Sequence, residues 1–524
     1  MLLSNSTKAL TAVIVLSVVL FFSFLGGTSV FQVAEARNAE CAREMLERND
    51  WIVPTFNGEL RTDKPVLEYY GMMLAYKVGG TNEASARFFS ALCGVLLVLA
   101  TFLIVKRHID LKAAWWSALA LLSSLHAIVQ FRLATPDPYL ILFHTLSIYF
   151  FFEGWHSRRW KWYAGMYISL GLAILAKGPV GLALPALSAF IFLLLTKSLD
   201  WKNIVALKPW WGLLIILLVS SPWYIAVHIK TGGAWTHEFF FDHNLDRFSK
   251  GIGRHNGPFI LSIAFILAGM LPLSIWFVSA FKNAWGSRKE NKLIVLALVS
   301  LTVVAVFYAL SKTKLINYTA PSYPFFAIIL GTYFSKVIRK EVKRTSIKPE
   351  LIVFTVFAIA IPVGIYFFTK NTDPLYSITW VAWLFVVVPI GAVAALWLNK
   401  KSVEKSLYAV VATFMLTSFI FFAVPFQAMD NQSPVVKFKA DIESFDNIVA
   451  YKTFDNAFAF YAKDRITVFK ELDELEDYLK DHEDVLIISR DKDLSYMDSI
   501  PNITCLQKGH DLFSSRSSGI YKIK

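Results

Sequence analysis

The sequence predicts an all-α polytopic membrane protein with about thirteen spanning helices, followed by a small α/β domain. Three observations carry this prediction: the apolar composition, the series of long apolar stretches and the placement of the basic residues. Of the 524 residues, 56% are hydrophobic and only 17% are charged, whereas soluble domains usually carry about a quarter charged residues. Such a chain is expected to lie in a bilayer.

Thirteen stretches are apolar over lengths that can cross a bilayer core of about 30 Å. They lie at Ala9 to Leu25 and at 84–105, 113–131, 138–154, 162–176, 179–196, 209–228, 258–281, 293–310, 316–335, 350–369, 377–398 and 406–425. We therefore predict a multispanning helical bundle. A cleaved signal peptide is the alternative for the first stretch, because Ala34-Glu35-Ala36 is typical of a cleavage site. However, that run is long for a signal peptide and ends well before the site.

The net charge of +13 would suit a nucleic-acid partner, but its placement favours a role in membrane topology. Basic residues gather in alternate short loops, namely Lys106 to Lys112, Arg158 to Lys161, Lys197 and Lys202, Lys282 to Lys292, Lys336 to Lys348 and Lys400 to Lys405. This is the positive-inside pattern. It predicts a cytoplasmic N-terminus and places segments 28–82 and 229–257, with the C-terminal tail, on the outer face. We expect no nucleic-acid partner.

Two domains are expected: residues 1–430 in the membrane, with the outer loop 28–82, and residues 431–524 outside it. The loop holds an amphipathic helix from Ala34 to Arg48, of a kind that lies in the membrane interface. After residue 430 the composition becomes mixed. Strands are predicted at 447–451, 466–469, 484–489 and 519–524, alternating with helices at 454–462 and 471–484, which is the pattern of a small α/β domain.

Ionisable residues near membrane depth are costly and are therefore functional candidates. Glu35 follows the first predicted helix, and Asp137 opens a later one between two prolines. Both are predicted on the outer face, so they would form a paired-carboxylate site in which either acts as a base. The alternatives are structural: Glu35 would complement a helix dipole, and Asp137 would be a helix N-cap.

Basic and aromatic residues on the same face suggest an anion site. Lys64 precedes a proline and is followed by Tyr69, an arrangement suited to a lipid-linked phosphate, although a snorkelling lysine would look the same. The other candidates are Lys177, His243, Arg247, Arg254, His255, Lys312, Lys314 and Tyr318. Several cations near the membrane surface suit an anionic leaving group such as a phosphate ester. Anionic-lipid binding is the alternative for each of them.

Taken together, the segments resemble the bacterial aminoarabinose-transferase and protein-mannosyltransferase-like families of the GT-C superfamily. The resemblance covers most of the membrane part. The residues that carry it occur in the family's order: Glu35 to Met45, Asp50 to Pro54, Asn57 to Glu59, Lys64-Pro65, Ala86 to Phe88, Leu175 to Pro179, Pro222 to Tyr224, His243 with Arg247-Phe248, and Ser311 through Tyr318 to Pro324.

The resemblance implies an inner-membrane glycosyltransferase that uses an undecaprenyl- or dolichyl-phosphate sugar. Transfer would occur on the periplasmic face, to lipid A, a protein or another glycan, by an inverting displacement. The family's first outer loop usually supplies an Asp-Glu pair, but here the Asp position is Ala34 and an expected tyrosine is Asn38.

Glu35 or Asp137 is therefore expected to orient or deprotonate the acceptor hydroxyl. The residues expected to hold the donor phosphate are Lys64, Arg247, Arg254, Lys312, Lys314 and Tyr318, with Arg37, Tyr69, Lys177, His243 and His255 as further candidates. The chemistry requires no cofactor. If a divalent cation assists, oxygen ligands would favour magnesium or manganese over zinc.

Three other functions fit a multispanning protein. A secondary transporter or lipid flippase would place polar residues through the bilayer midplane and show repeated halves, whereas the candidates here gather on the outer face without a visible repeat. A non-catalytic assembly scaffold would be compatible with the missing aspartate. A ligase of the O-antigen type is the third alternative, which the order of the motifs disfavours.

Overall fold

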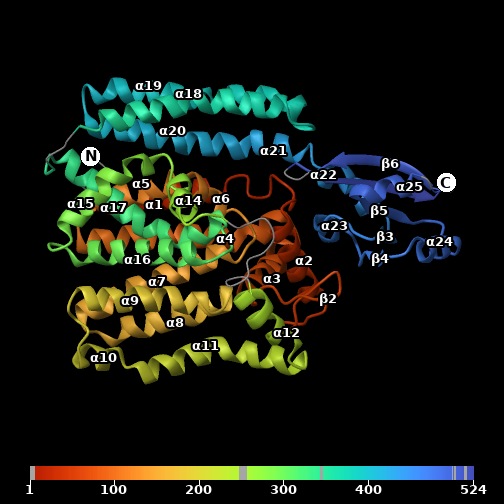
Figure 1. Ribbon diagram of the computed structural model, residues 1–524, viewed down its shortest axis with the longest axis horizontal. Coiled ribbons are helices and arrows are strands. Elements are labelled where there is room, and N and C mark those ends of the chain that lie inside the picture. Colours follow the sequence, from red (N-terminus) through yellow and green to blue (C-terminus); the bar gives the residue numbers. More distant parts are fainter. Residues whose placement is uncertain are drawn as a thin grey trace.

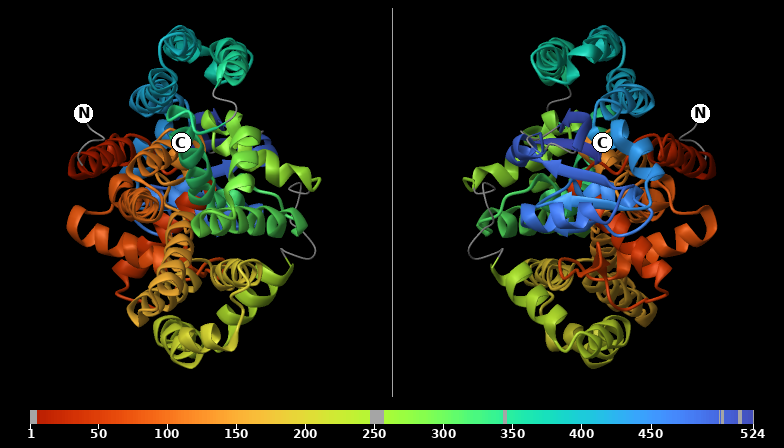
Figure 2. Two further views of the ribbon diagram at one scale, coloured as in Figure 1. Left: turned by 90° about the vertical axis from the view of Figure 1, so that its left-hand side faces the viewer. Right: turned by 90° about the vertical axis from the view of Figure 1, so that its right-hand side faces the viewer.

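The computed structural model describes residues 6–246, 257–342, 346–498, 500, 503–512 and 516–523. Most of the molecule is a bundle of helices that run roughly parallel to its long axis, and the C-terminal sheet lies beyond one end of the bundle (Figure 1). Helices α18–α20 form one edge of the bundle and α8–α11 the other, with the remaining helices between them (Figure 2). The described structure is therefore mainly helical, as the sequence predicts.

The helices of the bundle include α1 (Ser6–Phe22), α4 (Glu83–His108), α5 (Leu111–Leu122), α6 (Leu125–Gln130), α7 (Asp137–Ser157), α8 (Trp160–Lys177), α9 (Val180–Leu195), α10 (Trp201–Leu207), α11 (Pro209–Lys230), α12 (Ala234–His237), α14 (Ile260–Gly269), α15 (Phe277–Ser287), α16 (Lys292–Leu310), α17 (Tyr323–Ile338), α18 (Lys348–Lys370), α19 (Val387–Asn399) and α20 (Val403–Ala423). A π-helix, η2 (Glu238–Asp246), follows α12, and 3₁₀ turns occur at η3 (Leu273–Trp276), η4 (Ile316–Ser322) and η5 (Leu375–Val386).

By length and composition, six helical stretches among the described residues can cross a membrane. They are Glu83–His108, Trp201–Lys230, Lys292–Leu310, Lys348–Lys370, Leu375–Asn399 and Val403–Asp430. Shorter apolar helices are Ser6–Phe22, Leu111–Leu122, Val180–Leu195 and Ile260–Gly269. The membrane character of the bundle is thus evident from its helices, and the total of thirteen spans stays a prediction.

Several predicted spans are not single α-helices. The stretch 113–131 divides into α5 and α6, and 258–281 divides into α14, η3 and α15. These two breaks bond to each other, because the Ser124 hydroxyl donates to the Gly269 carbonyl at 2.7 Å and the Leu125 amide donates to the Leu271 carbonyl at 3.2 Å. An interrupted helix is tolerated at membrane depth where protein groups satisfy the freed backbone.

The first outer loop folds into α2 (Val33–Glu47), a hairpin of β1 (Thr55–Phe56) and β2 (Glu59–Leu60), and α3 (Leu67–Gly79). Asn57 and Gly58 form the two-residue turn, both with positive φ, as a type I′ hairpin requires. We predicted that the amphipathic helix α2 would lie against the bilayer. Instead it is enclosed by α3, β1 and the C-terminal region, and even Glu35 and Glu40 on its polar side are buried.

The C-terminal region holds α21 (Pro425–Asp430), α22 (Pro434–Ser444), α23 (Asn456–Tyr461), α24 (Leu472–Lys480), α25 (Leu494–Met497), a 3₁₀ turn, η6 (Asp491–Asp493), and the strands β3 (Ile448–Tyr451), β4 (Thr467–Phe469), β5 (Leu486–Arg490), β6 (Ile503–His510) and β7 (Ser517–Ile523). The described strands form one sheet in the order β4-β3-β5-β7-β6. β3 is parallel to β4 and β5, with Val449 opposite Thr467 and Ile487, whereas β7 is antiparallel to both its neighbours.

This sheet is joined to the first outer loop by polar contacts. Asn57 donates to the Ile466 carbonyl and accepts from the Ile466 amide, both at 2.9 Å. Arg43 donates to the carbonyls of Ala459 at 3.0 Å and Ala462 at 2.8 Å. Asn57 thus satisfies both backbone groups of Ile466, the residue before β4. These contacts hold the loop against the C-terminal region.

Replacing Asn57 by alanine is expected to destabilise the protein by about 1–3 kcal/mol, because two buried backbone groups lose their partner. The measurement is thermal unfolding in detergent micelles, with limited proteolysis to detect loosening of residues 431–524. Asn49→Ala is the matched control, since Asn49 has the same φ of 52° as Asn57, but its side chain accepts a hydrogen bond from Trp51 within its own loop. Equal losses for the two variants would show that backbone strain, not the contact with Ile466, is responsible.

Candidate active site

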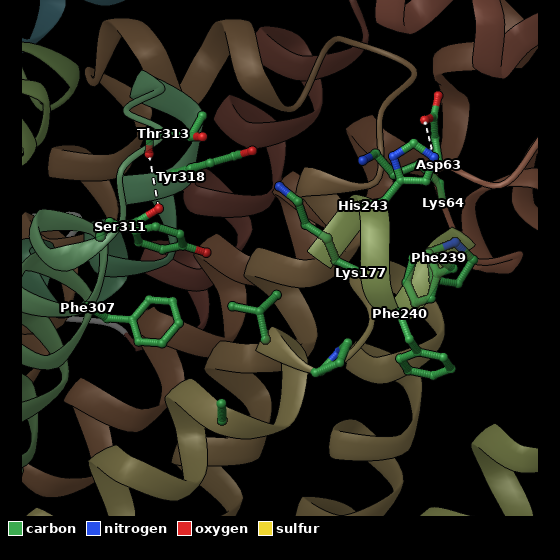
Figure 3. A pocket seen from close by; sticks show the side chains of 15 residues that line it. Asp63, Lys64, Lys177, Phe239, Phe240, His243, Phe307, Ser311, Thr313 and Tyr318 are labelled. Atoms are coloured by element: carbon green, nitrogen blue, oxygen red, sulfur yellow. Dashed lines mark hydrogen bonds and ion pairs between the residues drawn. The ribbon is translucent and has the colours of Figure 1, made fainter. Parts of the chain in front are cut away.

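A cavity of about 350 Å³ opens between the first outer loop and the ends of several bundle helices (Figure 3). It is lined by Asp63, Lys64, Pro65, Lys177, Pro179, Val180, Ala183, Phe239, Phe240, His243, Phe307, Tyr308, Ser311, Thr313 and Tyr318. Asp63 and Lys64 of the outer loop, Lys177 of α8, His243 of η2, and Tyr308, Ser311, Thr313 and Tyr318 supply polar side chains. Val180 and Ala183 of α9, Phe239 and Phe240 of η2 and Phe307 of α16 supply apolar surface. The cavity therefore suits a molecule with an anionic head and an apolar tail.

Lys177 reaches the cavity from the last turn of α8. Gly178 follows with a φ of 75°, a conformation that ends the helix and that glycine adopts without a steric penalty. Pro179 then precedes α9, so the chain reverses direction beside the lysine. The ammonium group points toward Tyr318 (Figure 3) and lies 4.9 Å from the centre of its ring.

Asp137 is the counter-ion of Lys177. One carboxylate oxygen lies 2.5 Å from the Lys177 ammonium, and the other accepts a hydrogen bond from the Asn317 amide at 3.1 Å. The N-cap alternative is wrong, because Pro136 holds that position and no side chain caps α7. The carboxylate is therefore turned toward α8 and η4. Asp137 does not itself line the cavity, but its partner Lys177 does.

Glu35 is placed differently. Its side chain is fully buried, and its two oxygens accept from Arg87 at 2.7 and 2.9 Å. One oxygen also accepts from the Ala134 amide at 2.9 Å. These bonds occupy the carboxylate, and Glu35 does not line the cavity. The hypothesis of a site in which Glu35 and Asp137 act together is corrected accordingly: Glu35 fixes the loop that leads to Asp137.

The cavity edge formed by the first outer loop carries a small polar network. His243 on η2 lies 3.2 Å from an Asp63 oxygen and 3.1 Å from the Thr62 hydroxyl. The same hydroxyl donates to Glu238 at 2.8 Å. Lys64, next to Asp63, lines the cavity. Both residues predicted here, Lys64 and His243, are thus brought together.

Other predicted residues lie elsewhere. Lys314 is buried, and its ammonium donates to the carbonyls of Tyr308 and Ala309 at 3.0 and 2.7 Å and to that of Ser311, so it closes the C-terminal end of α16. Lys312 is exposed and does not line the cavity.

Two residues of the first outer loop also lie outside the cavity. Tyr69 is fully buried and accepts from Arg61 at 3.1 Å. The Arg37 guanidinium lies over the Phe56 ring. Neither lines the cavity. Three further predicted residues, Arg247, Arg254 and His255, lie outside the described residues.

Sequence reasoning missed three residues behind the cavity. Arg61 donates to Asn38 at 2.7 Å, and Asn38 in turn donates to Glu68 at 3.3 Å and to the Ala134 carbonyl at 3.2 Å. Arg61 and Glu68 are buried ionisable residues. One feature of the sequence could have indicated Glu68: it is the one charged residue among the apolar and aromatic residues 66–70, directly after Lys64-Pro65.

The described residues assign no metal position, since no three histidine, cysteine or carboxylate side chains among them converge on one point. What the cavity offers chemically is a pair of lysines near a carboxylate. Lysine ammonium groups stabilise charge that develops on a phosphate, and a carboxylate can accept a proton from a hydroxyl. Together these groups suit transfer between a phosphate ester and an alcohol.

Comparison with known proteins adds three findings. Residues 63–225 match the family described as dolichyl-phosphate-mannose-protein mannosyltransferase. An uncharacterized protein of Aquifex aeolicus is 30% identical over 371 residues, which cover 70% of this chain and 72% of that one. The undecaprenyl phosphate-alpha-4-amino-4-deoxy-L-arabinose arabinosyl transferase of Shewanella sediminis is 27% identical over 428 residues, covering 79% and 76%.

Solved structures show the same fold. ArnT from Cupriavidus metallidurans bound to undecaprenyl phosphate superposes with a TM-score of 0.81 at 20% identity, covering 98% of both chains. The apo oligosaccharyltransferase of Archaeoglobus fulgidus gives a TM-score of 0.53 at 12% identity, covering 92% of this chain and 69% of that one. The likeness thus extends over the whole chain, including the C-terminal sheet.

Replacing Arg87 by methionine is expected to destabilise the protein by about 3–5 kcal/mol, because it leaves the Glu35 carboxylate buried without a counter-ion. Thermal unfolding in detergent micelles measures the effect. Arg107→Met is the control on the same helix, since that arginine is half exposed in its ion pair with Glu153 and should change stability by no more than about 1 kcal/mol. A small effect of Arg87→Met would mean that Glu35 finds another partner.

Proposed function

Because the chain belongs to the aminoarabinose-transferase-like family of GT-C membrane glycosyltransferases, we propose that it transfers a sugar from a polyprenyl-phosphate donor to an acceptor hydroxyl. The observation that carries this proposal is the cavity, which combines Lys64 and Lys177 with an apolar wall. The proposed acceptor is a hydroxyl group of a lipid A-like molecule, a protein or a glycan.

The donor would lie with its phosphate at the lysines and its isoprenoid chain along the apolar wall. Lys64 and Lys177 supply positive charge, and Tyr318 supplies a hydroxyl. Val180, Ala183 and Phe307 supply surface that an isoprenoid chain can cover. Because that chain comes from the bilayer and not from water, this wall holds it by van der Waals packing and not by the hydrophobic effect. Arg247 and Arg254 remain predicted phosphate ligands.

Asp137 is the proposed base. The acceptor oxygen attacks the anomeric carbon, its proton passes to Asp137, and the bond from that carbon to the phosphate oxygen breaks with its electron pair. Lys64 and Lys177 stabilise the charge that grows on the leaving phosphate. Lys177, now paired with Asp137 at 2.5 Å, can turn to the phosphate as the carboxylate is neutralised. Direct displacement inverts the anomeric centre.

The same proposal places the protein in the cell inner membrane with about thirteen spans and a cytoplasmic N-terminus. The cavity and the domain of residues 431–524 would then face the periplasm. Support comes from the cavity residues themselves. Lys64 in the loop before α3, Lys177 at the end of α8 and Tyr318 in η4 all belong to segments that the positive-inside pattern assigns to the outer face. Membrane lipids are the surrounding partners.

Asp137→Asn is expected to lower the rate of sugar transfer by about 10²–10⁴-fold, which is the contribution typical of a positioned base. The measurement is transfer of radiolabelled sugar in membranes that contain the protein, with a panel of polyprenyl-phosphate sugars as donors. Lys64→Ala should instead weaken donor binding and raise KM. Glu35→Gln and Lys312→Ala are the comparison variants, at equal protein levels.

Lys312→Ala should retain wild-type transfer, because its side chain is exposed outside the cavity. Loss of transfer in Glu35→Gln, with Asp137→Asn fully active, would return the base to Glu35 and refute the assignment. Transfer from none of the donors would favour a transporter or lipid flippase instead.

A further inference from the structure

Glu68 is a carboxyl group with an unused hydrogen-bonding atom. It lies in the first turn of α3 and has no exposed surface. Asn38 donates to one of its oxygens at 3.3 Å, whereas the other oxygen, Oε1, has no hydrogen-bond partner among the described residues. A buried acceptor without a partner is costly, so this arrangement calls for a functional explanation.

Four charged groups from three segments act on Glu68. Arg61 and Lys64 belong to the loop before α3, Asp137 opens α7, and Lys177 ends α8. Three neutral groups also face it: Cys41, Tyr69 and Tyr139. Lys64 and Lys177 line the cavity while Glu68 does not. Glu68 therefore lies behind the cavity wall, within electrostatic reach of the two cations that face a ligand.

The surroundings of Glu68 favour its neutral form. Burial raises its pKa to about 8, a change that Arg61, Lys64 and Lys177 oppose and Asp137 supports. Burial also raises the pKa of Cys41 and Tyr69 well above their usual range, so neither group gains charge before Glu68 does. As the pH rises, Glu68 is thus the carboxyl that adds negative charge behind the cavity.

We propose that Glu68 is a positioning residue that controls how strongly the cavity holds an anionic phosphodiester. As a neutral acid it leaves the charges of Lys64 and Lys177 to the ligand. As a carboxylate it becomes a second counter-ion beside Asp137 and opposes binding. This inference rests on the proposed donor site and adds to it a residue that never touches the donor.

The sign of the effect follows from the charges. Asp137 already pairs with Lys177 at 2.5 Å. The net positive charge that Lys64 and Lys177 offer an anionic ligand is therefore already reduced by one carboxylate. One further carboxylate near two cations in a partly buried site changes a binding constant by about tenfold. Donor affinity should therefore be high below the pKa of Glu68 and fall as the pH rises through it. Glutamine, which resembles the neutral acid, should remove this dependence.

The test uses full-length protein in detergent micelles and the methyl ester of undecaprenyl phosphate as the probe. This diester carries one negative charge throughout, so the ligand itself does not titrate between pH 6.5 and pH 9. We expect the wild type to lose about tenfold in affinity over this range and Glu68→Gln to lose much less. At pH 6.5 both proteins should bind alike. Glu68→Asp keeps an ionisable group and should restore the loss.

Glu40→Gln is the matched control. Glu40 lies in the same outer loop, it is buried, and burial raises its pKa to about 7, but it pairs with Arg43 and does not line the cavity. Its variant should keep the wild-type dependence on pH. Every other ionisable group is the same in the wild type and in Glu68→Gln, so the ratio of the losses isolates Glu68.

Two results would overturn the inference. If Glu68→Gln loses as much affinity as the wild type, Glu68 does not control binding, although the donor site stands. If the wild type binds the diester at neither pH, the donor site and the inference fail together. Should Glu68→Gln not fold, the wild type alone decides, because an affinity that stays constant between pH 6.5 and pH 9 contradicts the proposal.

Discussion

The arrangement of the end of the bundle that carries the candidate site depends on the buried ion pair of Arg87 and Glu35. Arg87 on α4 donates to both Glu35 oxygens and to the carbonyls of Leu25, Thr28 and Ser29. One pair of side chains thus joins the chain after α1, the start of α2 and the body of α4. Burying such a pair costs free energy, but removing one partner costs more, because the other charge is left buried and unpaired. The ion pair therefore holds these three segments in a fixed arrangement.

The candidate site is built outward from this junction in successive layers. Glu35 and Asn38 both bond to the Ala134 peptide, three residues before Asp137, and so determine where that carboxylate lies. Asp137 holds Lys177, and Lys177 faces Tyr318 across the cavity. The buried contacts of Glu35 and Asn38 thus support the segment that carries Asp137, and through Asp137 they support Lys177 at the cavity.

The sequence predicted the kind of protein and several residues of the candidate site. It did not predict which hydrogen bonds and ion pairs connect them. Apolar stretches, strands at 447–451 and 484–489, and the gathering of Lys64, Lys177, His243 and Tyr318 on one face were foreseeable, because each follows from local pattern and topology. The polar strand β6 was not. The roles of Glu35 and Lys314 were not foreseeable either, because they depend on the groups to which these side chains bond in the folded protein. Arg87 lies 52 residues from Glu35, and no local spacing reveals such a contact.

The contacts of the first outer loop also bear on how the protein is made. Ser29 bonds to Asp430, Val30 to Tyr461 and Asn57 to Ile466, over separations of 401 to 431 residues. The loop is therefore synthesised at least 401 residues before these partners. Contacts between such distant segments form late in folding. This end of the molecule therefore stays incomplete until residues 430–466 have been synthesised, so a chain terminated before them would hold membrane helices but lack the contacts that support the candidate site.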